Sequence, residues 1–436
     1  MRRKDEILNM KTKFIDELRW RGMLQDIMPE TEALLNSKQV TGYIGFDPTA
    51  DSLGVGNLVQ IMTLMHFQRA GHKPMALVGG ATGMVGDPSG KSDERNLLSE
   101  DILQHNLACQ KAQLEKFLDF NCGDNSAVIV NNYDWFKEFS FLDFIREVGK
   151  HITVNYMMAK DSVKKRLETG MSFTEFSYQL VQGYDFYHLW KNNGVQLQMG
   201  GSDQWGNIVT GTELIRRMAG GEAYALTTPL IKKADGTKFG KSEKGNIWLD
   251  PKKTSPYQFY QFWLNAADED VVNYIRIFSL KGKEEIETLE KEHFTNAGAR
   301  LLQKTLAEEI TIRVHSKEAY DKAVRASEIL FGKGTAEELA TIDEATLLSA
   351  MEGVKQAAVS LSEIENGIPI IDFLSEKTGL LPSKSEAKKM ILGNGISINK
   401  EKNADINAII SLKDLINNRY ILAQKGKKDY CLVVVG

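Results

Sequence analysis

The order of apolar and polar positions near the N-terminus predicts alternating strands and helices. Residues 42–47 are rich in strand formers and end before a proline, and residues 58–70 carry apolar side chains at helical spacing. A second apolar run, 75–78, follows a Lys-Pro break. A strand, a helix and a strand at this spacing predict a βαβ unit with a parallel sheet, so we expect an α/β fold.

The same reasoning predicts the later elements. Apolar periodicity predicts two helices and a strand in the middle of the chain, followed by a long helical region. The C-terminal part instead shows the patterns of short helices and short strands. The predicted elements are a leading helix at 4–24, helices at 99–120 and 172–189, a strand at 195–199, a helical region at 255–353 that includes 299–315 and 317–331, short helices at 370–378 and 384–392, a turn at 393–395, and strands at 396–398 and 430–435.

Three glycine-rich segments stand where ligands are expected. Residues 54–57 come at the start of the predicted helix, where free backbone N–H groups favour an anionic ligand. Residues 79–92 follow the second strand and are too glycine-rich for a packed element, which indicates a ligand loop. Residues 200–207 follow the strand at 195–199, and open α/β sheets bind ligands at the carboxyl ends of their strands.

Polar side chains also repeat on one side of the predicted helix 172–189. Tyr178, Gln182 and Asp185 fall within one narrow stripe. This stripe is either a solvated face or a polar patch in a buried wall, and the apolar neighbours Val181 and Phe186 favour the buried wall.

Composition narrows the class of protein. A chain of 436 residues with 42% hydrophobic and 26% charged residues suits a globular protein of two or three domains, and a net charge of -4 excludes a uniformly basic nucleic-acid binder. Residues 383–436, however, hold ten Lys or Arg against five Asp or Glu, so this segment is expected to contact nucleic acid.

Cysteine spacing and hydropathy give two further expectations. Cys109, Cys122 and Cys431 have no metal or redox spacing, so we expect a reducing compartment and no metal cluster. The N-terminal segment lacks the apolar region of a leader, and no apolar run approaches the ~20 residues that span a bilayer. A cytoplasmic protein is expected.

Two segments allow more than one interpretation. The aromatic residues between 133 and 158 suit an oligomer interface or an ordinary core about equally. The lysine-rich loop at 232–245 would be read as a solvated surface loop on its charge alone.

Five motifs in order carry a resemblance that covers essentially the whole chain. GYIGFDPTADSL, GGATGMVGDPSGK, FSYQLVQGYDF, QMGGSDQWGN and KFGKS resemble bacterial tyrosyl-tRNA synthetases, which are class I aminoacyl-tRNA synthetases. The resemblance implies a Rossmann-type catalytic domain at 1–248 with a dimerisation segment inserted at about 120–170. It also implies a helical anticodon-binding domain at 249–355 and a small basic α+β RNA-binding domain at 366–436.

The resemblance also implies a site and its ligands. These are L-tyrosine, ATP with Mg²⁺ and tRNA(Tyr), bound by a homodimer that needs no tightly bound cofactor and no membrane. Tyrosine is expected at Tyr43, Asp47, Thr82, Asp87, Tyr178, Gln182, Asp185, Gln198 and Gln204, and ATP at Gly54, Gly56, Asn57, Gly201, Asp203, Lys238, Lys241 and Ser242. Catalytic contacts to the phosphates are expected from Lys238, Lys241, Thr49, Asn57, Lys91 and Arg95.

One departure from the family pattern leaves alternatives open. The family usually carries His-x-Gly-His at the first helix, and Gly54 and Asn57 stand here in place of the histidines. The change is either tolerated in an active enzyme, with Thr49 or a backbone N–H replacing the lost contact, or a sign of a damaged site. We therefore weigh an active tyrosine enzyme against a relative that charges another amino acid, such as tryptophan, and against a catalytically weak RNA-binding protein.

Overall fold

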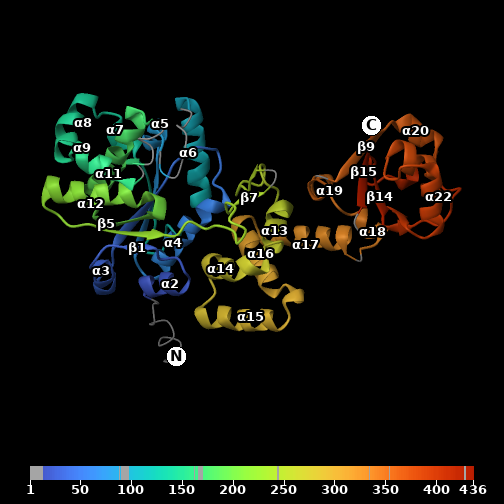
Figure 1. Cartoon of the computed structure of the whole chain (residues 1–436), viewed down its shortest axis with the longest axis horizontal. Helices are drawn as coiled ribbons and strands as arrows, with labels where there is room; N and C mark the ends of the chain where they lie inside the picture. The colour runs from blue at the N-terminus through green and yellow to red at the C-terminus, as the bar shows by residue number, and fades with distance from the viewer. Residues whose placement is uncertain are drawn as a thin grey trace. The chain divides into compact units, whose positions relative to one another are not determined.

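The computed structural model describes residues 13–87, 89, 98–161, 163–164, 170–242, 245–332, 334–352, 354–426 and 429–436 (Figure 1). Its contacts divide the chain into two compact units. The first holds the described residues up to Thr254 together with Phe262–Val314, and the second holds Ser255–Gln261 with the described residues from His315 onward. Residues 262–314 are thus grouped with the predicted catalytic domain, and the predicted boundaries at 248 and 355 stay predictions.

A six-stranded sheet forms the centre of the first unit. Its strands lie in the order β1-β6-β5-β2-β3-β4, and every neighbouring pair is parallel except β1 with β6. The strands are β1 (Asp26–Ile27), β2 (Thr41–Phe46), β3 (Lys73–Val78), β4 (Val128–Asn131), β5 (Val195–Gly201) and β6 (Tyr224–Thr228). The predicted α/β fold with a parallel sheet is confirmed. Because β2, β3, β4 and β5 run in the same direction, the segments that follow them meet at one edge.

Helices cover this sheet and continue beyond it. Helix α4 packs on β2 and β3, and α11 and α12 pack on each other and on β5. The helices of the first unit are α2 (Phe14–Trp20), α3 (Thr31–Ser37), α4 (Leu58–Arg69), α5 (Thr82–Val85), α6 (Glu100–Leu114), α7 (Tyr133–Phe136), α8 (Phe141–Glu147), α9 (Val154–Met158), α11 (Phe173–Asn193), α12 (Trp205–Ala219), α14 (Asp268–Phe278), α15 (Lys283–Thr295) and α16 (Leu301–Val314), while α13 (Pro256–Leu264) belongs to both units.

Several predicted elements differ from the structure in their bounds or nature. The predicted helix 99–120 ends at Leu114. Residues 4–12 of the predicted leading helix lie outside the described residues, and its described part ends at Trp20 rather than at residue 24, because Gly22 adopts a left-handed conformation with φ of 71°. The glycine-rich segment after β3 does contain a packed element, the short helix α5. Glycine permits it there, since a Cβ at Gly83 would lie 2.8 Å from Leu103 Cδ1.

Helix α11 is fixed at both ends and along its side. The Ser172 hydroxyl accepts the Glu175 N–H in a capping box, and Gly194 ends the helix with φ of 65°. Its crossing with α12 depends on small residues, because a Cβ at Gly211 would lie 2.8 Å from the Phe186 Cβ. The packing of α11 therefore fixes the position of its polar stripe, Tyr178, Gln182 and Asp185, relative to the sheet.

The aromatic segment 133–158 forms α7, α8 and α9, which lie beside α11 and α12 in Figure 1. Phe139, Phe144 and Tyr184 contact one another with ring centroids 5.3 to 6.1 Å apart. The opposite side of α8 is exposed, with Phe141 at 63% and Leu142 at 75%. The segment thus combines an inner aromatic core with an exposed apolar face.

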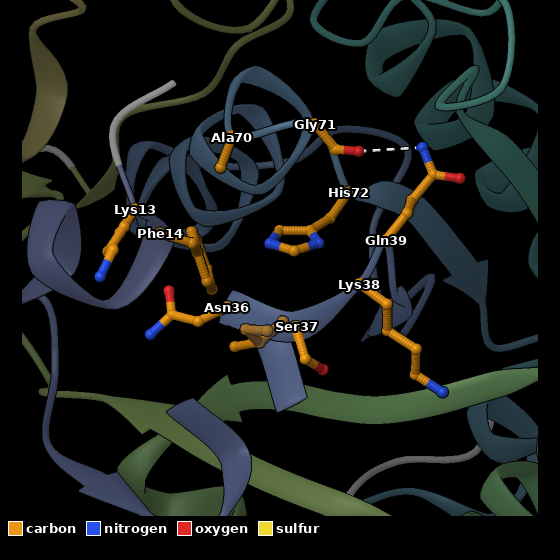
Figure 2. A pocket seen from close by; sticks show the side chains of 10 residues that line it. Lys13, Phe14, Asn36, Ser37, Lys38, Gln39, Ala70, Gly71 and His72 are labelled. Atoms are coloured by element: carbon orange, nitrogen blue, oxygen red, sulfur yellow. Dashed lines mark hydrogen bonds between the residues drawn. The ribbon is translucent and has the colours of Figure 1, made fainter. Parts of the chain in front are cut away.

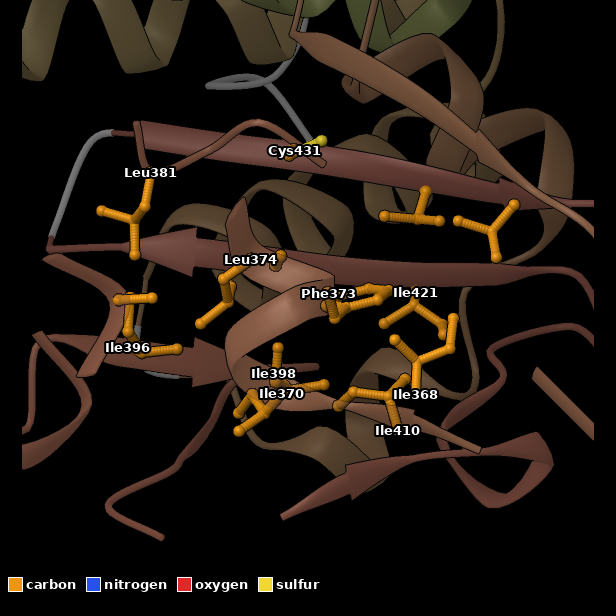
Figure 3. Packing of buried hydrophobic residues seen from close by; sticks show 14 of the residues in the cluster. Ile368, Ile370, Phe373, Leu374, Leu381, Ile396, Ile398, Ile410, Ile421 and Cys431 are labelled. Atoms are coloured by element: carbon orange, nitrogen blue, oxygen red, sulfur yellow. The ribbon is translucent and has the colours of Figure 1, made fainter. Parts of the chain in front are cut away.

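The second unit contains a smaller sheet in the order β12-β11-β14-β15-β9 and a two-stranded pair, β10-β13. Figure 3 shows its core, in which Phe373 and Leu374 pack against isoleucines from the strands. The strands are β9 (Lys355–Val359), β10 (Ile368–Pro369), β11 (Ile396–Ile398), β12 (Glu401–Lys402), β13 (Ile409–Ile410), β14 (Tyr420–Lys425) and β15 (Asp429–Val435), and the helices are α17 (Lys317–Phe331), α18 (Ala336–Leu339), α19 (Glu344–Ala350), α20 (Leu361–Asn366), α21 (Ile370–Asp372), which continues as a π-helical turn (Phe373–Lys377), and α22 (Lys384–Leu392).

Candidate active site

A cavity of about 300 Å³ opens at the carboxyl ends of β2 and β5. Most of the side chains predicted from the sequence line it, although they come from five separate segments. The predicted residues on its wall are Tyr43, Asp47, Thr49, Gly56, Asn57, Thr82, Asp87, Tyr178, Gln182, Asp185, Gln198, Gly201, Asp203 and Gln204. The polar stripe of α11 therefore belongs to the wall of a cavity and not to a solvated face.

Asp47 joins the end of β2 to two other segments. Its carboxylate accepts a hydrogen bond of 2.8 Å from the Thr82 hydroxyl and one of 2.9 Å from the Tyr178 hydroxyl. Because the Tyr178 hydroxyl uses its hydrogen in this bond, its oxygen still has lone pairs that can accept from a ligand. Burial raises the pKa of Tyr178 well above its ordinary value, so the hydroxyl stays protonated.

Asp185 is the most deeply buried carboxyl group of the cavity, with 1% of its surface exposed. Trp135 Nε1 donates to one oxygen over 2.9 Å and Asn132 Nδ2 donates to the other over 3.0 Å. Burial raises the pKa of Asp185 to about 8, although these two hydrogen bonds oppose the rise and nearby Asp47 adds to it. A donor from a ligand would favour the ionised carboxylate.

Within the described part of the cavity wall, three buried polar atoms have no hydrogen-bond partner, and one of them is Gln60 Oε1 on α4. The other two are the Tyr43 hydroxyl, which lies on β2, and Gln198 Oε1, which lies on the neighbouring strand β5 at the register position of Tyr43. Such atoms cost free energy unless a ligand or water pairs with them. Burial raises the pKa of Tyr43, and the Asp185 charge lies close enough to the Tyr43 hydroxyl to add to this rise, so this end of the cavity indicates a ligand with a polar group.

A hydrogen-bonded network surrounds Asp87, another carboxyl group of the cavity wall. Gln204 Nε2 donates to its Oδ2 over 2.7 Å, and the Ser89 N–H donates to its Oδ1 over 3.0 Å. Asn207 Nδ2 donates to Gln182 Oε1 over 3.0 Å. This network holds the Asp87 carboxylate and the Gln182 amide oxygen as acceptors on the cavity wall, which suits a cationic group.

Helix α4 begins beside the lysine-rich loop 232–245. This loop ends in a pair of short strands, β7 (Lys241–Ser242) and β8 (Gly245–Asn246). The Val55 N–H donates to the Ile247 carbonyl, and the Ile247 N–H donates to the Gly240 carbonyl. Gly54 pairs with Trp248, and its N–H donates to Asn57 Oδ1 over 3.0 Å, so the amide nitrogen of Asn57 remains a donor. Gly54 itself does not line the cavity.

The predicted phosphate-binding lysines lie outside the cavity wall. Lys238 and Lys241 are exposed on the loop that packs against the start of α4, and neither forms an ion pair within the described residues. The side chain of Ser242 and the residues Lys91 and Arg95 lie outside what the structure describes.

Several residues of the site were not predicted from the sequence. Gln60 and Leu230 line the cavity. Asn132 and Trp135, which donate hydrogen bonds to Asp185, and Asn207, which donates one to Gln182, support the wall without lining it. The sequence does contain a pattern that could have predicted Asn132. The apolar run at residues 127–130 is followed by two asparagines, as expected for a strand whose carboxyl end lies at the ligand-binding edge of a parallel sheet. Asn207 and Gln60 gave no such signal, because they lie inside helices.

A second cavity, of about 360 Å³, lies beside the ends of α3 and α4 (Figure 2). Gln39 crosses its rim to donate to the Gly71 carbonyl, and none of the predicted site residues lines it. Among the described residues, no group of three or more His, Cys, Asp or Glu side chains could hold a metal ion. No helix in the described ranges is long and apolar enough to cross a membrane.

Comparison with known families agrees with the fold. Residues 35–332 match the sequence model of a family described as tRNA synthetases class I (W and Y). Residues 349–433 match a tyrosine–tRNA ligase SYY-like C-terminal domain. The fold, the cavity at the strand ends and these matches define a class I tRNA synthetase of the tryptophan and tyrosine type.

Relatives and solved structures give a finer placement. The chain is 63% identical over 422 residues to a tyrosine–tRNA ligase of Cytophaga hutchinsonii, covering 96% of this chain and 99% of that protein. It is 61% identical to one of Bacteroides thetaiotaomicron, covering 97% and 99%. A C-terminally truncated mitochondrial tyrosyl-tRNA synthetase of Aspergillus nidulans superposes with a TM-score of 0.67 at 29% identity, over 75% of this chain and 97% of that one. The chain belongs to the tyrosine–tRNA ligase family.

Proposed function

We propose that this chain activates L-tyrosine with ATP and transfers the tyrosyl group to tRNA(Tyr). The observation that carries the proposal is the buried pair formed by Asp185 and the Tyr43 hydroxyl, which has no hydrogen-bond partner among the residues that the structure describes. A phenol hydroxyl can donate to Asp185 and accept from Tyr43, which satisfies both groups at once. The indole of tryptophan has no oxygen to accept from Tyr43, so the pair favours tyrosine over tryptophan.

The opposite end of the amino acid fits the Asp87 network. The α-ammonium group has three N–H donors, and Asp87, Gln182 and the Tyr178 oxygen offer three acceptors. Asp47 and Thr82 fix Tyr178, while Gln198 and Gln204 complete the wall. The tyrosine carboxylate would then point towards Gly201 and Asp203, where we place the ribose of ATP.

In the proposed first step, the tyrosine carboxylate oxygen attacks the α-phosphorus of ATP, the bond to the β-phosphate oxygen breaks, and pyrophosphate leaves. In the second step, a terminal hydroxyl of tRNA attacks the carbonyl carbon and AMP leaves. Neither step needs a nucleophilic side chain, so catalysis depends on positioning and on neutralising phosphate charge. We assign this neutralisation to Lys238, Lys241, Lys91 and Arg95, together with Thr49, Asn57, Gly56 and Ser242.

ATP would bring Mg²⁺ with it, which neutralises phosphate charge. The carboxylates of the cavity fit this arrangement, because they are already engaged by hydrogen-bond donors rather than clustered for a metal. The basic C-terminal domain is proposed to hold tRNA, and the protein is proposed to be cytoplasmic.

Exchange of labelled pyrophosphate into ATP tests the function directly. We expect exchange with tyrosine and not with phenylalanine or tryptophan, which would also mean that Gly54 is tolerated. Exchange with tryptophan would contradict the assignment of the amino acid. No exchange with any of the three, together with retained tRNA binding, would favour a catalytically weak RNA-binding protein.

A homodimer is part of the proposal, and the exposed face of α8 supports it. Phe141, Leu142 and Ile145 expose 63%, 75% and 46% of their surfaces, which is unusual for three large apolar residues on one short helix. Replacing Leu142 by Glu should convert the dimer to a monomer in sedimentation experiments. Leu392→Glu, at a leucine of the second unit with 60% of its surface exposed, is the control, and a dimer unaffected by Leu142→Glu would contradict this interface.

The pKa of Asp185 predicts how tyrosine affinity depends on pH. Because burial raises this pKa to about 8, the free carboxyl group is mostly protonated below pH 8, and the phenol hydroxyl binds its ionised form. Tyrosine affinity should therefore increase from pH 6 to pH 8, by up to about tenfold per pH unit, and binding should release a proton. Calorimetric titration in buffers of different ionisation enthalpy measures both.

Trp135→Phe sharpens this test. It removes a hydrogen bond that lowers the pKa of Asp185, so the increase in affinity should move to higher pH. Trp190→Phe is a matched control, because the Trp190 Nε1 donates to the Glu222 carbonyl and does not reach the cavity. Affinity that does not change between pH 6 and pH 8 would contradict the role of Asp185.

A further inference from the structure

Phe239 separates the two lysines of the KFGKS loop, and its surroundings differ from theirs. Residues 234–238 and Lys241 are exposed, whereas Phe239 is half-buried and Gly240 is buried. The ring lies among four aromatic rings of the first unit: Phe262 and Trp263 at 5.9 Å, Tyr274 at 5.0 Å and Phe278 at 5.4 Å between centroids. With Phe278 it forms a stacked pair whose planes meet at 19°.

The neighbouring residue fixes the other side of the loop. Gly240 has φ of 81°, and a Cβ there would lie 2.9 Å from Val55 Cγ2 and 3.3 Å from the Gly56 nitrogen. Only glycine fits this conformation at this distance from the start of α4. A second attachment to α14 comes from the Ala234 N–H, which donates to Asp270 Oδ1 over 2.8 Å.

The loop is therefore held at two places, one before Lys238 and one between Lys238 and Lys241. From this geometry we infer that Phe239 is a positioning residue for the reaction, because its ring attaches the loop to α14 and so sets where Lys238 and Lys241 meet the phosphates of ATP. This inference rests on the proposed function. Phe239 does not touch the cavity, so it acts only through the lysines.

Phe239 is not needed to form the aromatic cluster itself. Trp263 and Phe278 contact each other at 5.0 Å, and Trp263 and Tyr274 at 6.3 Å, so this cluster persists between the helices without the loop. Removal of the ring should therefore release the loop while the helices stay folded. An ammonium group displaced by about 1 Å from its working position can lower a rate by about 100-fold.

The experiment compares Phe239→Ala and Phe239→Leu with the wild type in tyrosine-dependent pyrophosphate exchange. We expect kcat to fall by about 10- to 100-fold in Phe239→Ala and to recover in part in Phe239→Leu, while the tyrosine Kd stays within about twofold. Phe294→Ala, which removes an aromatic ring with 67% of its surface exposed, is the matched control and should leave both values unchanged. Circular dichroism and thermal melts confirm that the variants fold.

A second comparison separates positioning from a structural role. If Phe239 acts through the lysines, Phe239→Ala should add little to the loss already caused by Lys241→Ala, because residues that act together are not additive. Unchanged kcat in Phe239→Ala, additive losses in the double variant, or an equal loss of tyrosine affinity would each overturn the inference. If the wild type itself shows no exchange, the proposed function fails and not the role of Phe239 alone.

Discussion

Asp185→Ala is expected to abolish tyrosine activation at ordinary tyrosine concentrations while the protein stays folded. The substitution removes the acceptor for the phenol hydroxyl and leaves the N–H donors of Asn132 and Trp135 without their partner in a fully buried place. Removing one member of a buried, charged hydrogen-bonded pair costs about 2 to 5 kcal/mol in binding. Tyrosine affinity should therefore fall by at least about 30-fold.

Equilibrium binding of tyrosine and of phenylalanine measures this effect. The phenol partner matters only for tyrosine, so the variant should lose most of its preference for tyrosine over phenylalanine. Asp143→Ala, at an exposed aspartate of α8, is the control for a change of charge elsewhere. Unchanged tyrosine affinity in Asp185→Ala would show that the phenol hydroxyl is bound elsewhere.

Lys241→Ala should act on the rate and not on tyrosine binding. Lys241 lies outside the wall of the cavity, on the loop beside the start of α4, so its proposed contact is with the leaving pyrophosphate. Removing one group that stabilises charge developing in a transition state costs about 100- to 1000-fold in rate. Adenylate formation should slow by this factor, and the tyrosine Kd should stay unchanged.

Single-turnover formation of adenylate, followed beside equilibrium tyrosine binding, separates these two effects. Lys252→Ala, which removes another exposed lysine near the same loop, should affect neither. The clamp role of Lys241 would be wrong if the variant bound tyrosine more weakly and formed adenylate at the normal rate. If both expected results are found, Asp185 serves tyrosine binding and Lys241 serves the chemical step.

Local patterns in the sequence predicted much of the first unit. The strand at 43–46, the helix from Leu58 and the parallel pairing of β2 with β3 follow from side-chain periodicity and the Lys-Pro break. In the second unit, the helices 317–331 and 384–392 and the strand 396–398 coincide with the predicted elements. These segments have strong apolar periods, and the structure does not act against their local preferences.

Other elements had no comparable signal. Strands β1 and β4 are short, and β6 and β14 were not predicted, because an isolated apolar run of four to six residues suits a buried helix or a strand equally. Helix α5 was wrongly excluded because the segment 79–92 was judged too glycine-rich for a packed element. In the structure the glycines of this segment provide space. A Cβ at Gly83, inside α5, would lie 2.8 Å from Leu103 Cδ1, and a Cβ at Gly79, before α5, would meet Thr82 and Asp47.

The site shows the same division between local and tertiary information. The sequence by itself determined the parallel α/β architecture, the polar stripe of Tyr178, Gln182 and Asp185, and the family to which the motifs point. Only the tertiary structure decided that Asn132 and Trp135 hold Asp185, because these residues lie about 50 positions away along the chain and meet it across the sheet edge. Burial decided the pKa of Asp185 in the same way, since the exposure of a carboxyl group depends on distant segments that no local pattern records.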